Sequence, residues 1–384
     1  MRQQIQGMSQ PNPLKHKLSG EINIKSIQAL EEQIREHERA IIKLKRARNA
    51  LLNISTLPPE VLGDIFRRNV TLEDDFDGLE GGSRNFMSVC HHWSEVALRT
   101  PEVWSFWGNN PIDWARWHRH SGTSQLDLVL GGYDSDDSDG ILDITLRDAL
   151  RDRAARDGIR RIHLWSASGN AEFLSSIISP LVVAGQGVRS NSVESFILWN
   201  DGNTPVDVSD FFASYRFPRL RHLDFFECRI TSWDLLTSRT TVLTSLALHI
   251  SHPSPRPTTS QLLSILASNP SLRKISLSRR SIPDDGAGES PRPVLFRHLK
   301  ELELAGGLRH VIAFLHRLDH PTNTNLNITL YNHTASDITQ IVGPYLRDFL
   351  RRCDRSQGGL GLSVKGGLYT TFQVGDVADL TCLL

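Results

Sequence analysis

The chain has 384 residues, of which 39% are hydrophobic, and at about 150 residues per domain this length allows two or three domains. Its 43 Lys and Arg residues balance 43 Asp and Glu residues. Binders of nucleic acids and of anionic membranes depend on a clustered cationic surplus, so this balance argues against both partners.

The four cysteines lie far apart, at positions 90, 228, 353 and 382, without a C-x-x-C pair. This spacing disfavours a disulfide scaffold and a thiolate zinc site. The first residues are polar, and no later stretch approaches the roughly 18 uninterrupted apolar residues of a membrane span. We therefore expect a protein of the cytoplasm or the nucleus.

Residues 1–20 lack hydrophobic periodicity and are expected to be a flexible lead-in. Residues 21–52 are predicted to form one helix, because apolar side chains recur there at alternating three- and four-residue steps. The stripe consists of Ile27, Leu30, Ile34, Ile41, Leu44 and Leu51, interrupted by His37 and Arg48. Two interpretations stay open: a short coiled coil that forms a weak homodimer, and a helix packed against the neighbouring domain.

Residues 53–107 are predicted to form a small all-helical domain. Pro58 and Pro59 open a first helix, since proline is tolerated in a first turn. A second amphipathic run from Phe86 to Ala97 ends before Pro101. Between the two runs, the acidic, glycine-containing stretch 70–84 indicates a solvated loop.

Residues 108–384 carry a divergent repeat. The clearest unit, Leu220-x-x-Leu223-x-Phe225-x-x-Cys228-x-Ile230, fits the leucine-rich-repeat template at every required position. Shorter matches begin at Ile159, Val193, Leu243, Leu272 and Leu299, and weaker ones near Gln125, Asn325 and Gly359. Plausible helices lie between the strands, at 171–183, 208–215, 260–268, 308–318 and 336–352.

Each strand-plus-helix unit can bury its apolar face only by stacking on its neighbours. The repeat therefore predicts an irregular α/β solenoid with a parallel sheet on its concave side. An ordinary α/β domain is the alternative, because only one unit carries the Asn/Cys position of the template.

No catalytic or ligand-holding pattern was found. The pairs His91-His92 and His118-x-His120 lack cysteines or carboxylates at ligand spacing, and the glycine-rich segment 358–367 lacks the G-K-[ST] of a phosphate-binding loop. The aspartate run 134–140 resembles the start of a calcium loop, but Leu146 stands where the bidentate Glu is needed. We expect no enzyme, no metal site and no cofactor.

Three separated pieces of residues 54–104 together resemble an F-box domain. They are LPPEVLGDIF at 57–66, MSVCHHW at 87–93, and the segment from Leu98 that ends in PEVW at Trp104. The chain looks like the F-box-like proteins common in mushroom-forming (basidiomycete) fungi, which often join a heptad helix, this box and a leucine-rich-like tail. The resemblance implies an α + α/β fold class: an N-terminal heptad helix and a small all-helical F-box, followed by an irregular leucine-rich-repeat-like solenoid.

This family implies a non-catalytic substrate adaptor of a Skp-cullin-F-box ubiquitin ligase. The box docks on the Skp linker subunit, and through it on a cullin, while the repeats recruit an unknown protein for ubiquitin-dependent degradation. The alternative is a coiled-coil and repeat scaffold for protein–protein interaction whose box has drifted and no longer engages the ligase.

The resemblance carries the Skp-linker contact onto the Leu-Pro pair and the apolar faces of the box helices. The residues are Leu57, Pro58, Val61, Leu62, Ile65, Phe66, Val89, Trp93, Leu98 and Trp104. Among them we favour contact for Leu57, Pro58 and Leu62, and a place in the box's own core for Val89 and Trp93.

Strand register alone proposes candidates for the concave, substrate-facing side of the repeats. These are His163, Trp165, Arg221, Asp224, Arg273 and Glu301.

Overall fold

A computed structural model describes most of the chain. The described residues are 13–52, 57–72, 82–107, 119–132, 158–166, 171–185, 192–202, 204–214, 217–240, 242–251, 256–283, 293–321, 323–331, 340, 344, 360–365 and 370–376. Those up to Arg99 belong to one compact unit and those from Thr100 onward to a second. None of the described helices is long and apolar enough to cross a membrane.

The first unit begins with one long helix, α1 (Pro13–Ala50). It starts eight residues earlier than the expected boundary at Glu21, so the predicted flexible lead-in is wrong from Pro13 onward. Its side chains are described from residue 26 to 49, and all are exposed except the half-buried Asn49. The apolar stripe of α1 therefore contributes nothing to a core within the described part of the chain.

Three shorter helices form a cluster in the same unit: α2 (Pro59–Leu72), α3 (Gly82–Val89) and α4 (His91–Arg99). Pro59 is the first residue of α2 and Glu60 lies in its first turn, both favourable at a helix N-terminus. Each of the three helices contacts the other two. We call these three helices the three-helix cluster.

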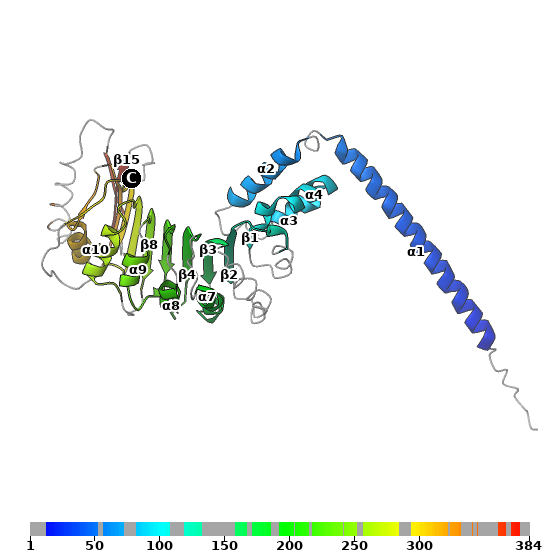
Figure 1. The fold of residues 1–384 in the computed structure, drawn as a ribbon, viewed down its shortest axis with the longest axis horizontal. Coiled ribbons are helices and arrows are strands. Elements are labelled where there is room, and N and C mark those ends of the chain that lie inside the picture. Colours follow the sequence, from blue (N-terminus) through cyan, green and yellow to red (C-terminus); the bar gives the residue numbers. More distant parts are fainter. Residues whose placement is uncertain are drawn as a thin grey trace, which may run out of the picture. The chain divides into compact units, whose positions relative to one another are not determined.

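The second unit contains a sheet of eleven strands (Figure 1). In spatial order they are β1 (Phe106–Trp107), β2 (Leu126–Gly132), β3 (Ile159–Ser166), β4 (Ser195–Asn200), β6 (His222–Phe226), β8 (Ser245–Ile250), β9 (Lys274–Arg279), β11 (Glu301–Gly307), β13 (Asn325–Tyr331), β15 (Thr370–Asp376) and β14 (Leu360–Lys365). The pairs from β1 to β13 are all parallel, and β13–β15 and β15–β14 are antiparallel.

Two rows of apolar side chains run across this sheet in register. One row is Leu128, Ile162, Phe196, Leu223, Leu246, Ile275, Leu302 and Leu326, each at most 1% exposed. The other is Leu130, Leu164, Leu198, Phe225, Leu248, Leu277, Leu304 and Ile328, each at most 3% exposed. These are the paired apolar positions of the predicted repeats, and their alternation with outward residues follows from the two-residue period of a strand.

Helices cover the side of the sheet on which these rows lie. They are α7 (Ala171–Gly185), α8 (Ser209–Ser214), α9 (Asp234–Arg239), α10 (Thr259–Ala267) and α11 (Leu308–Leu315). Phe211 of α8 stacks on Phe196 of β4 with ring centroids 4.8 Å apart, and Figure 1 shows α7, α8, α9 and α10 following one another beside the strands. Two small parallel sheets, β5 (Val206–Asp207) with β7 (Cys228–Arg229) and β10 (Val294–Leu295) with β12 (Leu318–Asp319), complete the unit.

Four of the five helices expected between repeats are present, with ends within three residues of the expected positions. The expected helix 336–352 lies outside the described residues apart from 340 and 344. Helix α9 and the short strands were not expected. The expected boundary at 107 is also displaced, because the 3-10 helix η3 (Pro101–Trp104) and β1, which pairs with β2, belong to the second unit.

Candidate functional site

The three-helix cluster has a core built around Phe66. Its ring stacks on Phe86 of α3 with centroids 4.4 Å apart, and packs on Trp93 of α4 with centroids 5.1 Å apart. Leu62 and Phe66 are fully buried. One aromatic side chain thereby ties all three helices together.

A second apolar face of α2 points to solvent. Val61 and Ile65 are 44% and 43% exposed, and they lie four residues apart on the same side of the helix. Pro58, just before α2, is exposed and lies three residues from Val61, which continues this face. Val89, at the end of α3, is 50% exposed. These exposed apolar side chains are the candidates for contact with a partner.

The ten residues assigned to Skp-linker contact fall into three groups. Pro58, Val61, Ile65 and Val89 are exposed, whereas Leu57, Trp93 and Leu98 are half-buried. Leu62, Phe66 and Trp104 are buried, so their side chains are not available for contact, contrary to the expectation.

The physical reason lies in packing. Leu62 and Phe66 are on the inward face of α2, and Trp104 lies in the second unit, where its ring packs on His120 with centroids 5.0 Å apart. The interpretation of Val89 as a core residue is likewise wrong, because it ends its helix half exposed.

The sheet of the second unit has an open face, defined here as the side opposite the buried rows and their helices. Side chains bridge neighbouring strands on this face. His163 Nε2 lies 2.9 Å from Ser195 Oγ, and His249 Nδ1 lies 2.5 Å from Ser278 Oγ. Lys274 Nζ lies 2.9 Å from Glu301 Oε2, with both side chains about half exposed.

One row of the open face is aromatic. Trp165, Trp199, Phe226 and His249 stand next to one another on successive strands. The ring centroids of Trp199 and Phe226, and those of Phe226 and His249, are each 5.8 Å apart. Trp199 is 44% exposed, so the row presents an indole to solvent. Aromatic side chains of this kind are typical anchors of protein–protein interfaces.

Asp224 lies on the same face, on β6 between Leu223 and Phe225. Burial raises the pKa of its carboxyl group to about 6, although a hydrogen bond from Trp199 and the positive charge of Lys274 act in the opposite direction. Its Oδ1 is buried and has no hydrogen-bond partner within the described part of the chain. Next to the aromatic row, the open face therefore carries a hydrogen-bond acceptor whose charge depends on pH.

The structure brings four of the six substrate-contact candidates onto the open face: His163, Trp165, Asp224 and Glu301. Arg221 and Arg273 instead precede β6 and β9, where their backbone carbonyls accept hydrogen bonds of 2.8 Å from Thr244 N and Lys300 N. Trp199, Phe226 and His249 were missed. A signal for them existed, because each directly follows the third apolar position of its L-x-x-L-x-L repeat, as Trp165 does.

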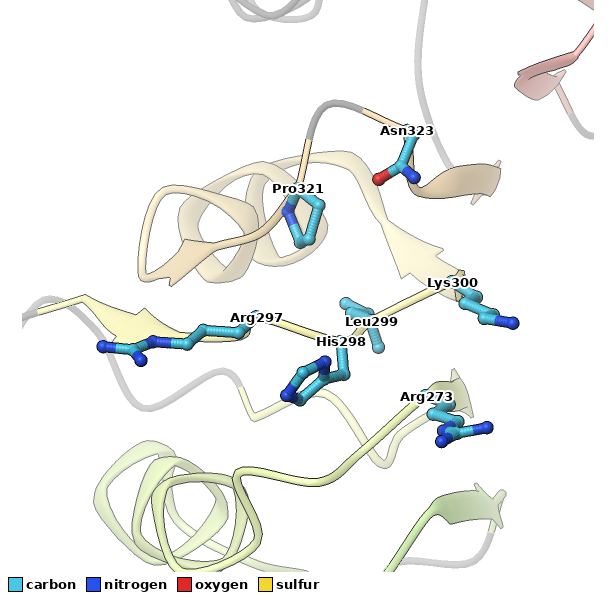
Figure 2. A pocket seen from close by; sticks show the side chains of 7 residues that line it. All are labelled: Arg273, Arg297, His298, Leu299, Lys300, Pro321 and Asn323. Carbon is cyan, nitrogen blue, oxygen red and sulfur yellow. The ribbon is translucent and has the colours of Figure 1, made fainter.

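Arg273 also lines a pocket at the amino-terminal ends of the strands (Figure 2). The other lining residues are Arg297, His298, Leu299, Lys300, Pro321 and Asn323. Figure 2 shows the guanidinium of Arg297 on one side of the pocket and the charged ends of Lys300 and Arg273 on the other. Because these cationic groups diverge, they do not form a cradle for one anion.

The described residues contain no group of three or more His, Cys, Asp or Glu side chains that could hold a metal ion. No protein-family model matches the chain, and no curated protein matches it.

Proposed function

We propose that the protein is an F-box substrate adaptor of a Skp-cullin-F-box ubiquitin ligase, acting in the cytoplasm or nucleus without catalysis of its own. The three-helix cluster docks on the Skp linker, and the sheet unit, a degenerate leucine-rich-repeat-like solenoid, recruits the protein substrate. The observation that carries the proposal is the exposed apolar face of α2, at Val61 and Ile65, on a cluster whose core is already filled.

The two faces of α2 have different roles: one forms the core of the cluster, and the other is available to a partner. Leu62 and Phe66 hold the cluster together, so the outward side chains are free to contact a partner without loss of the fold. Burying them at an interface would release about 25 cal/mol per Å² of apolar surface. Pro58, Val61 and Ile65, with Val89 as a further exposed residue, are therefore the contacts that we assign to the Skp linker.

The sheet unit supports the second half of the proposal. The strands of the large sheet lie side by side in chain order from β1 to β13, with two continuous buried rows, as stacked repeats require. Its open face offers the aromatic row together with His163, Asp224 and Glu301. We assign the protein substrate to this face.

The double variant Val61→Asp/Ile65→Asp tests the docking. Full-length wild-type protein should co-elute with the purified Skp linker, and the variant should bind at least a hundredfold more weakly, because two interfacial carboxylates would lose their hydration. Arg67→Glu, which places a carboxylate on an exposed residue of the same helix on a different side from Val61 and Ile65, is the matched control and should bind as wild type. Circular dichroism should show equal helix content in all three proteins.

Substitutions at Leu62 and Phe66 would not test docking on the Skp linker, because both residues are buried and their loss would unfold the cluster. Wild-type protein that fails to co-elute with the Skp linker, or a double variant that binds like wild type, would overturn the proposal. The first outcome would favour the scaffold alternative.

A further inference from the structure

The apolar stripe of α1 is an unpartnered surface. Ile27, Leu30, Ile34, Ile41 and Leu44 are between 50% and 71% exposed, and Leu51, just past the helix, is 84% exposed. Their steps of three and four residues make Ile27, Ile34 and Ile41 the a positions of a heptad and Leu30 and Leu44 the d positions. A stripe of this period is covered when a second helix packs along it.

The charges of α1 are arranged in two blocks. Residues 26–39 carry four acidic and two basic side chains, whereas residues 40–52 carry four basic side chains and no acidic one. Within the described part of the chain, Glu32 pairs with Arg35 at 2.9 Å, but no ion pair joins the two blocks. A parallel partner would set like blocks side by side, and an antiparallel copy would set opposite blocks side by side.

The two polar residues that interrupt the stripe, His37 and Arg48, also favour antiparallel pairing. In a parallel pair Arg48 would face Arg48 of the second copy across the seam, which brings two guanidinium groups together. In an antiparallel pair centred near Arg39, Arg48 faces Leu30 and His37 faces Ile41. Each polar side chain then meets an apolar one, along which its stem can pack while its polar end reaches water.

We propose that α1 forms an antiparallel coiled coil with a second copy of this chain. In the register that aligns the whole stripe, Ile34 packs opposite Leu44, and Glu31 lies beside Lys45 at both ends of the seam. The partner is the same chain because the stripe packs on its own reversed copy in this register, and two Glu31–Lys45 pairs outweigh the one like-charge contact between the Glu38 side chains of the two copies. The dimer does not depend on the ligase and would present two three-helix clusters and two sheet units in one assembly.

The orientation can be tested with two single variants of the full-length chain, each carrying a different affinity tag. Alone, Glu31→Lys and Lys45→Glu should each dimerise roughly tenfold more weakly than wild type, since two exposed ion pairs become like-charge contacts. Mixed together, they should form a heterodimer in preference to either homodimer. Native mass spectrometry after subunit exchange measures this preference, which should disappear at about 1 M salt, where screening is nearly complete.

Two controls separate the outcomes. Ile34→Asp/Leu44→Asp should be monomeric by sedimentation equilibrium with unchanged thermal unfolding of the sheet unit, because both side chains are exposed. Gln28→Lys, away from the seam, should dimerise as wild type. A wild-type chain that stays monomeric, or a mixture of the charge variants that shows no preference for the heterodimer, would overturn the proposal.

Discussion

Trp165 lies across Gly131 of the neighbouring strand. The two residues are partners in the β2–β3 register, and a Cβ atom built on Gly131 would overlap the indole ring. The missing side chain thus makes the space that the first tryptophan of the aromatic row occupies. This glycine is required by close packing and not by an unusual backbone angle.

Gly131→Ala should therefore destabilise the sheet unit by about 1–3 kcal/mol, the usual cost of forcing an extra carbon into a packed site. Denaturant unfolding measures the loss, and tryptophan fluorescence should report the displaced ring. In a Trp165→Leu background the same alanine should cost much less, because the smaller side chain can yield. An equal cost in both backgrounds would show that the indole is not the cause.

Asp224 should make the stability of the sheet unit depend on pH. Its pKa is about 6 in the folded chain against an ordinary value of 3.8, so the unfolded chain ionises first as pH rises. The contribution of Asp224 to stability should therefore be greatest below about pH 4 and fall by up to about 3 kcal/mol between pH 4 and pH 6.

Asp224→Asn should remove this decline and stabilise the protein at pH 7. Asp201→Asn, at an exposed position, should leave the pH profile of urea unfolding as in wild type. If the Asp224 variant kept the wild-type profile, the decline would have to arise from another group.

The sheet was predictable because its signal is local. Leu223 and Phe225, and the matching pairs in most of the other repeats, flank a polar residue, and a strand has only two faces on which to place them. The residues that decorate the open face were harder to assign. Arg221 and Arg273 were placed on it although each lies just outside its strand, where a shift of a single residue changes the face.

The docking residues show a second limit of prediction from sequence, namely which face of an amphipathic helix becomes buried. Leu62 and Ile65 are both apolar residues of one helix, yet one is fully buried and the other is 43% exposed. Which side of α2 becomes the core depends on where α3 and α4 pack, and in particular on Phe86 and Trp93 meeting Phe66. Helical periodicity in α2 alone does not contain that information, so the assignment of Leu62 to a partner failed.

The difference between these two residues should appear directly in stability. Leu62→Ala should destabilise the three-helix cluster by about 2–5 kcal/mol, whereas Ile65→Ala should change its stability by no more than about 0.5 kcal/mol. Thermal unfolding followed by circular dichroism in the full-length chain compares them. Similar losses for both variants would mean that the outward face of α2 is covered within the protein.

Within the described part of the sheet unit, the pair of Asp127 and Arg160 should lose more stability on mutation than the pair of Glu301 and Lys274. Asp127 is 5% exposed, and Arg160 Nε donates to its Oδ1 at 2.9 Å, while Arg160 Nη2 donates to Oδ2. This hydrogen bonding raises the pKa of the Arg160 guanidinium further above its usual value. Asp127→Asn should lower the free energy of unfolding in urea by about 2–4 kcal/mol, because it leaves a half-buried cation without its counter-charge.

Glu301→Gln, which breaks the half-exposed pair with Lys274, should lower the free energy of unfolding by less than about 1 kcal/mol. Equal costs would mean that burial does not set the strength of these pairs.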